Sequence, residues 1–203
     1  MQNGGVYQAQ TPALSCTDEG VPASNGYWGH RLGDKLINAG KTQRVIIACI
    51  GIGSTGTTFW ATTQFSWRFG VAFRRLSSLG LLSANRVFLL SSLGGLDQTQ
   101  ALSSGTVQVN LNTIITAIRA AGFTTTPIYL ALSSWAGGGT GGANGTNVRT
   151  GITAAIAGNS NVLTGADTDT IVIGSRYDTN HYKATGSDTA ATLWFNVIQG
   201  VFP

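Results

Sequence analysis

The sequence predicts an α/β fold in three layers, with a mainly parallel sheet between helices. Short apolar runs, typical of buried strands, alternate with amphipathic stretches of about 10–15 residues. Glycine and small polar residues follow several of the apolar runs, where loops are expected. Hydrophobic residues make up 42% of the 203, which is enough for one sizeable core.

The elements follow from local pattern in chain order. Residues 1–28 lack a long periodic pattern and are predicted to form an extended N-terminal arm, with residues 29–203 as the α/β domain. Helical spacing of apolar residues predicts helices over Gly29–Lys41, Trp67–Leu79, Val107–Ala121, Val148–Ala157 and Ser187–Gln199. Apolar runs predict strands over Arg44–Ile52, Val87–Leu90 and Pro127–Leu132, and Thr170–Ile173 is a further short apolar run.

Loops at the carboxyl ends of parallel strands form binding sites in open α/β sheets. Gly51–Gly56, Ser91–Asp97 and Ser133–Gly145 are such loops here, together with the segment before the last helix. We expect them to share a pocket rim. Trp60 and Trp135 follow strands next to this rim and offer surfaces for stacking on sugars, although packing in the core explains them equally well.

Composition and charge exclude several classes of protein. The longest apolar run, residues 45–52, is far shorter than the roughly 20 residues of a membrane span. The net charge is +4, but the basic residues are scattered along the chain, so nucleic acid is not the expected partner. Only 10% of residues are charged, and no signal peptide is visible at the N-terminus. Such a neutral, polar surface is common in virion, extracellular and cell-surface proteins.

No cofactor or metal is predicted. The glycines of residues 137–142 lack the lysine and serine or threonine of a phosphate loop, so we expect a flexible loop there. No Cys-x-x-Cys or Cys/His cluster indicates a metal site. Cys49 lies in an apolar run and is expected to be a small buried thiol, while its pairing with Cys16 stays open.

Asp178 and His181 are the sharpest candidates for chemistry. An aspartate three residues before a histidine can orient the imidazole and stabilise its protonated form when the histidine acts as a base. The alternative is an aspartate that caps a loop beside a half-exposed histidine. Ser54, in a glycine-rich turn after an apolar run, is a weak candidate nucleophile, and a polar turn residue is the alternative. His30 falls in a predicted helix and is expected to serve packing or the surface.

These residues resemble a known family, the SGNH hydrolases, and in particular a branch common in phage tail and proteobacterial proteins. The resemblance runs from about Val6 to Trp194. Its most specific part is the segment from Arg176 to His181, which resembles the family block that carries the catalytic Asp-x-x-His. The segment from Arg44 to Ser54 resembles the block whose glycine, here Gly53, donates to the oxyanion. Weaker similarities lie in 6–9, 12–14, 28–36, 147–149, 167–169 and 193–194.

Two blocks of the family depart from the pattern. The first strand, which ends in Gly-Asp-Ser or Gly-Gln-Ser and supplies the nucleophile, would lie upstream of Val6, so the SGNH-like (flavodoxin-like) sheet is expected to lack it. The block that usually reads His-Gln-Gly-Glu before an aspartate reads Ser92-Leu93-Gly94-Gly95-Leu96 before Asp97. The resemblance therefore implies a scaffold with part of its chemistry lost. An open sheet edge would need cover from the N-terminal arm or from another subunit.

The sequence alone favours a catalytically degenerate SGNH-like domain. Such a domain would be a structural or binding module of a virion (decoration, tail or fibre) or of a cell surface, contacting protein subunits or polysaccharide. The alternative is a carbohydrate O-acetylesterase with His181 as base, Asp178 as its orienting group, Ser54 or another serine as nucleophile and Gly53 in the oxyanion hole. The candidate binding residues are Trp60, Trp135, Asp97 and Arg176.

Overall fold

A computed structural model describes residues 28–84 and 88–202 of the chain. The predicted arm of residues 1–28 therefore lies outside the described residues, apart from Trp28. The chain divides into two compact units. Among the described residues, the first combines those up to Gly53 with those from Ile171 onward, and the second is Ser54–Thr170.

The second unit contains a three-stranded sheet that is parallel throughout. Its strands are β1 (Leu89–Ser91), β2 (Ile128–Leu132) and β3 (Val162–Asp167), in the spatial order β1-β2-β3. The pairing of β2 with β3 shifts register between Leu130 and Leu132, where β2 ends. The predicted α/β fold class with its parallel sheet is confirmed.

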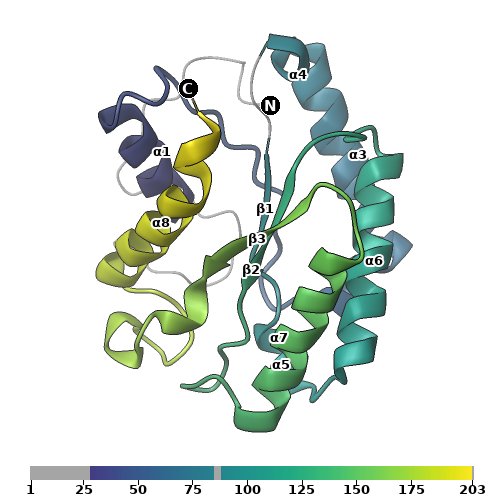
Figure 1. The fold of residues 1–203 in the computed structure, drawn as a ribbon, viewed down its shortest axis with the longest axis vertical. Helices are drawn as coiled ribbons and strands as arrows, with labels where there is room; N and C mark the ends of the chain where they lie inside the picture. The colour runs from purple at the N-terminus through teal and green to yellow at the C-terminus, as the bar shows by residue number, and fades with distance from the viewer. Residues whose placement is uncertain (1–27, 85–87, 203) are drawn as a thin grey trace. The chain divides into compact units, whose positions relative to one another are not determined.

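Parallel neighbours require crossover connections, and the long helices of this unit supply them. Helix α6 (Ser104–Ala120) lies between β1 and β2 in the chain, and α7 (Gly142–Ala157) between β2 and β3. The two helices lie side by side along the sheet (Figure 1). The side chain of Ser103 caps α6 by accepting from the amide of Thr106. The apolar face of α6 forms much of the core through Val107, Leu111, Ile114, Ile115 and Ile118.

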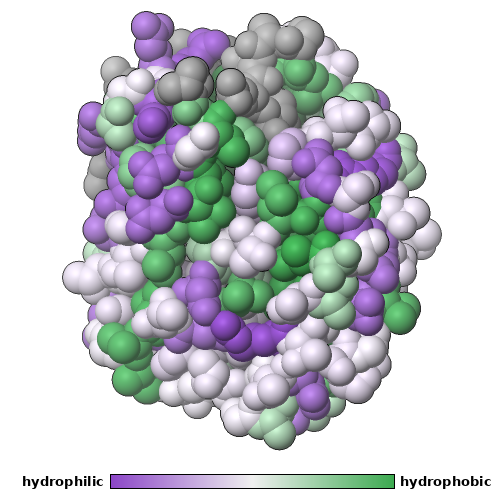
Figure 2. Space-filling model, viewed as in Figure 1, coloured by the Kyte–Doolittle hydropathy of each residue, from purple (hydrophilic) through white to green (hydrophobic). Residues whose placement is uncertain are grey.

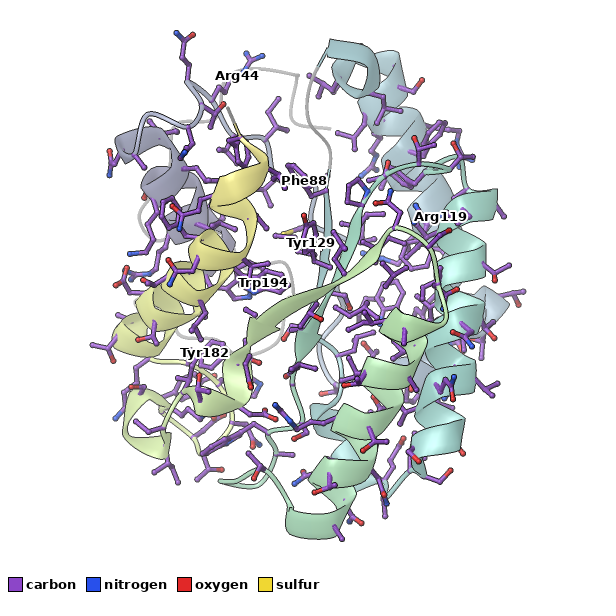
Figure 3. The ribbon with its side chains drawn as sticks, viewed as in Figure 1. Arg44, Phe88, Arg119, Tyr129, Tyr182 and Trp194 are labelled. Atoms are coloured by element: carbon purple, nitrogen blue, oxygen red, sulfur yellow. The ribbon has the colours of Figure 1, made fainter. Side chains whose placement is uncertain are left out.

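The remaining helices of the second unit are shorter or more peripheral. They are α2 (Thr57–Trp60), α3 (Thr63–Ser78), α4 (Leu81–Ala84), α5 (Gly95–Thr99) and the 3-10 turn η2 (Thr168–Thr170). Arg119 at the end of α6 fastens the loop before β2, because its guanidinium donates to the carbonyl oxygens of Phe123 and Thr126 (Figure 3).

The first unit is a helical pair joined from distant parts of the chain. Helix α1 (Trp28–Asn38) packs against α8 (Ala184–Ile198), flanked by the 3-10 turns η3 (Ile173–Ser175) and η4 (Gln199–Val201). The rings of Trp28 and Trp194 stack with their centroids 5.4 Å apart, and Trp194 is completely buried. A surface ion pair between Lys35 and Asp188, 3.1 Å long, joins the same two helices.

One predicted strand is absent, and one observed strand was not predicted. Residues 44–52 form neither helix nor strand, and Ile46 and Ile47 are 50% and 37% exposed, so the predicted strand buried on both faces is wrong. A β-branched run favours an extended backbone, but only a neighbouring strand in register makes it part of a sheet. The last strand is Val162–Asp167, whereas Thr170–Ile173 lies in and between the turns η2 and η3.

Cys49 is also different from the prediction. It is exposed and disulfide-bonded, so the predicted buried thiol is wrong. Ile46, Ile47 and Ala48, which suggested burial, are themselves exposed. The sequence holds one other cysteine, Cys16, which lies outside the described residues.

The described surface mixes hydrophilic and hydrophobic residues, as the face in Figure 2 shows. In the part of the chain that the structure describes, no helix combines the length and the apolar character that a membrane crossing requires.

Candidate functional site

A short antiparallel turn before α8 carries the Asp-x-x-His motif. The amide of Lys183 donates to the carbonyl of Ser175 over 2.8 Å, and the amide of Tyr177 donates to the carbonyl of His181 over 2.9 Å. Between these bonds the backbone forms an isolated antiparallel bridge. Thr179, at the tip, has a φ of 72°, in the left-handed region that tight turns often require. The hairpin from residue 175 to residue 183, which we call the dyad hairpin, therefore fixes the backbone on both sides of the motif.

Asp178 and His181 meet as the sequence predicts. The imidazole Nδ1 lies 2.6 Å from Oδ2 of Asp178, and the other carboxylate oxygen accepts from the amides of Asn180 and His181 over 3.1 and 2.8 Å. The carboxylate is thus held by the same turn that it orients. The side chain of His181 is 56% exposed.

The hydrogen bonds around Asp178 favour its ionised form. Burial alone raises the pKa of this carboxyl, but the backbone and side-chain hydrogen bonds of His181 and the amide of Asn180 outweigh it, and the pKa falls below its ordinary value. An ionised Asp178 favours the tautomer of His181 that carries its proton on Nδ1. Nε2 is then the nitrogen that can accept a proton.

Tyr177 packs against the imidazole from within the same hairpin. The two rings stack with their centroids 5.7 Å apart and an angle of 22° between their planes. Burial and the nearby charge of Asp178 raise the pKa of Tyr177, so its hydroxyl stays protonated at neutral pH. The histidine is therefore fixed by a carboxylate at one nitrogen and by an aromatic ring on one face.

Arg176 was predicted to bind a ligand, but its side chain is buried. It is only 5% exposed, and its guanidinium donates to the carbonyls of Ile171 and Asn180 while lying 4.7 Å from the ring centroid of Tyr182. Figure 3 shows Tyr182 near the start of α8. The buried guanidinium clamps the dyad hairpin from inside, so Arg176 is not an exposed binding group.

Gly53 and Ser54 lie in the turn where the chain passes from one unit to the other. Ser54 is exposed and has a φ of 56°, uncommon for a residue with a side chain. Strained serines of this kind occur in the turns that present nucleophiles, although many have no such role.

Asp97 is buried and serves the second unit internally. It is 0% exposed, and its carboxylate accepts from both the amide and the hydroxyl of Thr57, each over 2.9 Å. Burial raises its pKa against the lowering effect of these bonds. A Cβ on Gly56 would lie 2.6 Å from the carboxylate, so only glycine allows this close approach. Asp97 caps α2 from a distant segment, and its predicted role in ligand binding does not fit this burial.

The two candidate tryptophans differ. Trp60 is 4% exposed and packs against Phe65 and Phe69 with ring centroids 5.9 and 5.5 Å away, so it belongs to the core and not to a binding rim. Trp135 is half-buried at the end of β2, where a sugar-binding role stays a prediction.

Sequence reasoning missed the role of Asp169 in holding the loop that carries Trp135. Its carboxylate accepts from the amide and hydroxyl of Ser134 over 2.8 and 2.7 Å, and from the amide of Trp135 over 3.0 Å. Arg149 reaches the same carboxylate over 3.0 Å and binds Asp167 through two further bonds of 2.7 and 2.8 Å. The Asp-x-Asp spacing at the end of β3 was the available signal, because it places two carboxylates at one strand end.

The hydrogen bonds between Arg149 and Asp167 shift the pKa of both groups. They raise the pKa of the guanidinium and lower that of the carboxyl, so both groups are charged at neutral pH. Among the described residues, no cluster of three or more His, Cys, Asp or Glu side chains could hold a metal ion.

Comparison with known proteins shows a likeness in fold. No family model matches the chain, and no curated protein matches it. The X-ray structure of a protein from Arabidopsis thaliana is similar, with a TM-score of 0.64 and 15% sequence identity over 87% of this chain and 67% of that chain. At this identity the likeness shows the fold alone.

Proposed function

We propose that this chain belongs to an SGNH-like ester hydrolase that removes an acyl group from a carbohydrate. The observation that carries the proposal is the preformed pair of His181 and Asp178, joined over 2.6 Å and held by two backbone amides. The sequence alone favours a module without catalysis. The geometry of the pair favours acyl transfer, because an aspartate that only capped the loop would not also have to hydrogen-bond an exposed imidazole.

The dyad would perform the proton transfers of the reaction. Nε2 of His181 accepts the proton of a serine hydroxyl as the hydroxyl oxygen attacks the ester carbonyl, and later gives it to the departing sugar oxygen. Asp178 holds the tautomer and stabilises the imidazolium that forms. Water then attacks the acyl-serine with the same histidine as base, which releases the acid and restores the serine. Backbone amides such as that of Gly53 would stabilise the oxyanion.

Hydrolysis by matched variants tests the proposal. We expect the protein to hydrolyse p-nitrophenyl acetate and to release acetate from an acetylated xylan. His181→Gln and Asp178→Asn should each lower kcat by about a thousandfold or more. Asp188→Asn changes an exposed aspartate on α8 and should leave kcat unchanged. Equal rates for the wild type and His181→Gln would overturn the proposal, and Ser54→Ala tests the candidate nucleophile within the same series.

A second function is the non-catalytic module of a virion or cell surface, in contact with other subunits or glycans. The observation that favours it is the block from Ser92 to Asp97. The polar residues that the family carries there are replaced by small and apolar ones, and the retained Asp97 is buried against Thr57. Light scattering after size exclusion, with a glycan-binding screen, measures this function. A strict monomer that binds no glycan would exclude it.

A further inference from the structure

Basic residues are unevenly placed along the chain. No aspartate or glutamate occurs between Asp34 and Asp97, yet this stretch holds seven of the 12 lysines and arginines. Three of the seven lie on one helix, α3 (Thr63–Ser78), which contains no acidic residue. Although the basic residues look scattered in the sequence, the fold concentrates part of them on a single helix.

The outer face of α3 presents these charges beside an exposed indole. Trp67 is 57% exposed, while Phe69 and Ala72, on the opposite face, are buried. Arg74 follows Trp67 by seven residues and Arg75 follows Arg68 by seven, so each pair lies along the helix about 10 Å apart. These four residues form what we call the α3 face.

The indole has a fixed orientation. Its Nε1 donates to the carbonyl of Gln64 over 2.8 Å, and the guanidinium of Arg68 lies 5.8 Å from the ring centroid. Arg74 and Arg75 are exposed, and neither forms an ion pair among the residues that the structure describes. Their positive charge is therefore available to an anionic partner.

We propose that the α3 face binds an anionic polysaccharide. A sugar ring would stack on Trp67, and carboxylate or sulfate groups along the chain would pair with Arg74 and Arg75. Arginine suits this contact because its planar guanidinium donates two parallel hydrogen bonds to a carboxylate. The inference rests on the proposed function for its choice of a carbohydrate, and it narrows the substrate to acidic glycans.

The packing of α3 disfavours a membrane surface as partner. A helix that lies in a bilayer interface buries its apolar face in lipid. The apolar face of α3 is already used inside the unit, where Phe73 makes an edge-on contact with Phe123 at 5.2 Å between ring centroids. Nucleic acid is also less suitable, because tight binding typically involves about six to ten phosphate contacts and this face offers three arginines.

Binding of polygalacturonate, a polymer of uronic acid, tests the proposal directly. We expect it to quench tryptophan fluorescence with an affinity that falls as salt is added. Arg74→Gln with Arg75→Gln should weaken binding about tenfold or more, and Trp67→Ala should weaken it as well. Lys41→Gln with Arg44→Gln removes the same charge from the other unit and should change the affinity less than twofold.

Three outcomes would overturn the inference. Equal weakening by both double variants would show attraction by net charge alone. Binding of neutral dextran as tightly as polygalacturonate would remove the role of the arginines. Tighter binding of duplex DNA or of phosphatidylserine vesicles would assign the α3 face to another class of partner. Circular dichroism of each variant verifies its folding.

The test separates this inference from the proposed hydrolysis, because binding needs no turnover. Polygalacturonate that binds the α3 face, together with equal hydrolysis by wild type and His181→Gln, would support the surface and refute the dyad's catalytic role. Hydrolysis that depends on His181 without polygalacturonate binding would refute the surface alone.

Discussion

Replacement of Asp169 by alanine should destabilise the second unit more than any surface charge change. The side chain is 6% exposed, and its loss leaves the amide and hydroxyl of Ser134 and the amide of Trp135 without their acceptor. A buried donor without a partner costs about 1–3 kcal/mol, and water entering the vacated space offsets part of the sum. Arg149 keeps its two bonds to Asp167, so the three donors that lose their acceptor set the cost, and we expect a loss of about 3–5 kcal/mol.

Urea denaturation followed by circular dichroism measures this loss. For a chain of this length, a loss of 3–5 kcal/mol corresponds to a fall in Tm of roughly 10 °C. Asp188→Ala is the matched control, because its ion pair with Lys35 is exposed at the surface and contributes about 0–1 kcal/mol. If Asp169→Ala and Asp188→Ala differ by less than about 0.5 kcal/mol, the carboxylate of Asp169 does not hold the loop and the reasoning is refuted.

Further predictions concern a glycine and two carboxylates. Gly186→Ala should lower the Tm, because the new Cβ would clash with the carbonyl oxygen of Ser175. This effect should outweigh the higher helix propensity of alanine. An unchanged Tm would contradict the close packing of α8 on the dyad hairpin. The low pKa of Asp178 implies a stabilising contribution that is complete above about pH 4 and lost as the pH falls through the folded-state value. The free-energy difference between wild type and Asp178→Asn in urea should therefore shrink from pH 7 to pH 3, and a constant difference would exclude this effect. Asp97→Ala should lower the free energy of unfolding by about 2–3 kcal/mol. Asp97→Asn should lower it less, because the amide oxygen still accepts a hydrogen bond and no charge is buried. Urea denaturation measures both variants, and an equal loss for the two would contradict this prediction.

The sequence predicted the helices well because their signals are local. Apolar residues at helical spacing in Val107–Ala121 and glycine at the end of this segment depend on no distant partner. Strands depend on their neighbours, which explains both errors. Residues 44–52 have strong β propensity but form no strand, whereas Val162–Asp167, with a glycine and two exposed positions, becomes one beside β2.

The candidate site shows the same difference between local contacts, which the sequence predicts, and contacts between distant residues, which it does not. The pairing of Asp178 with His181 was predictable because three residues separate them and one turn brings them together. The capping of α2 by Asp97 was not, because Thr57 lies 40 positions away. Arg176 was predicted to bind a ligand, but its guanidinium donates to backbone carbonyl oxygens, and no sequence pattern marks such partners.

Because α1 and α8 lie far apart in the sequence, the ribosome makes them at different times. Residues 54–170 are continuous, so this unit has all its parts as soon as residue 170 has left the ribosome. The first unit needs α8, which is made more than 140 residues after α1, and the indole of Trp28 has no Trp194 to stack on until then. Because domains fold as their parts emerge, the pairing of α1 with α8 behind the dyad hairpin is completed last. A released fragment that ends before Ala184 would carry a folded sheet and no helical pair.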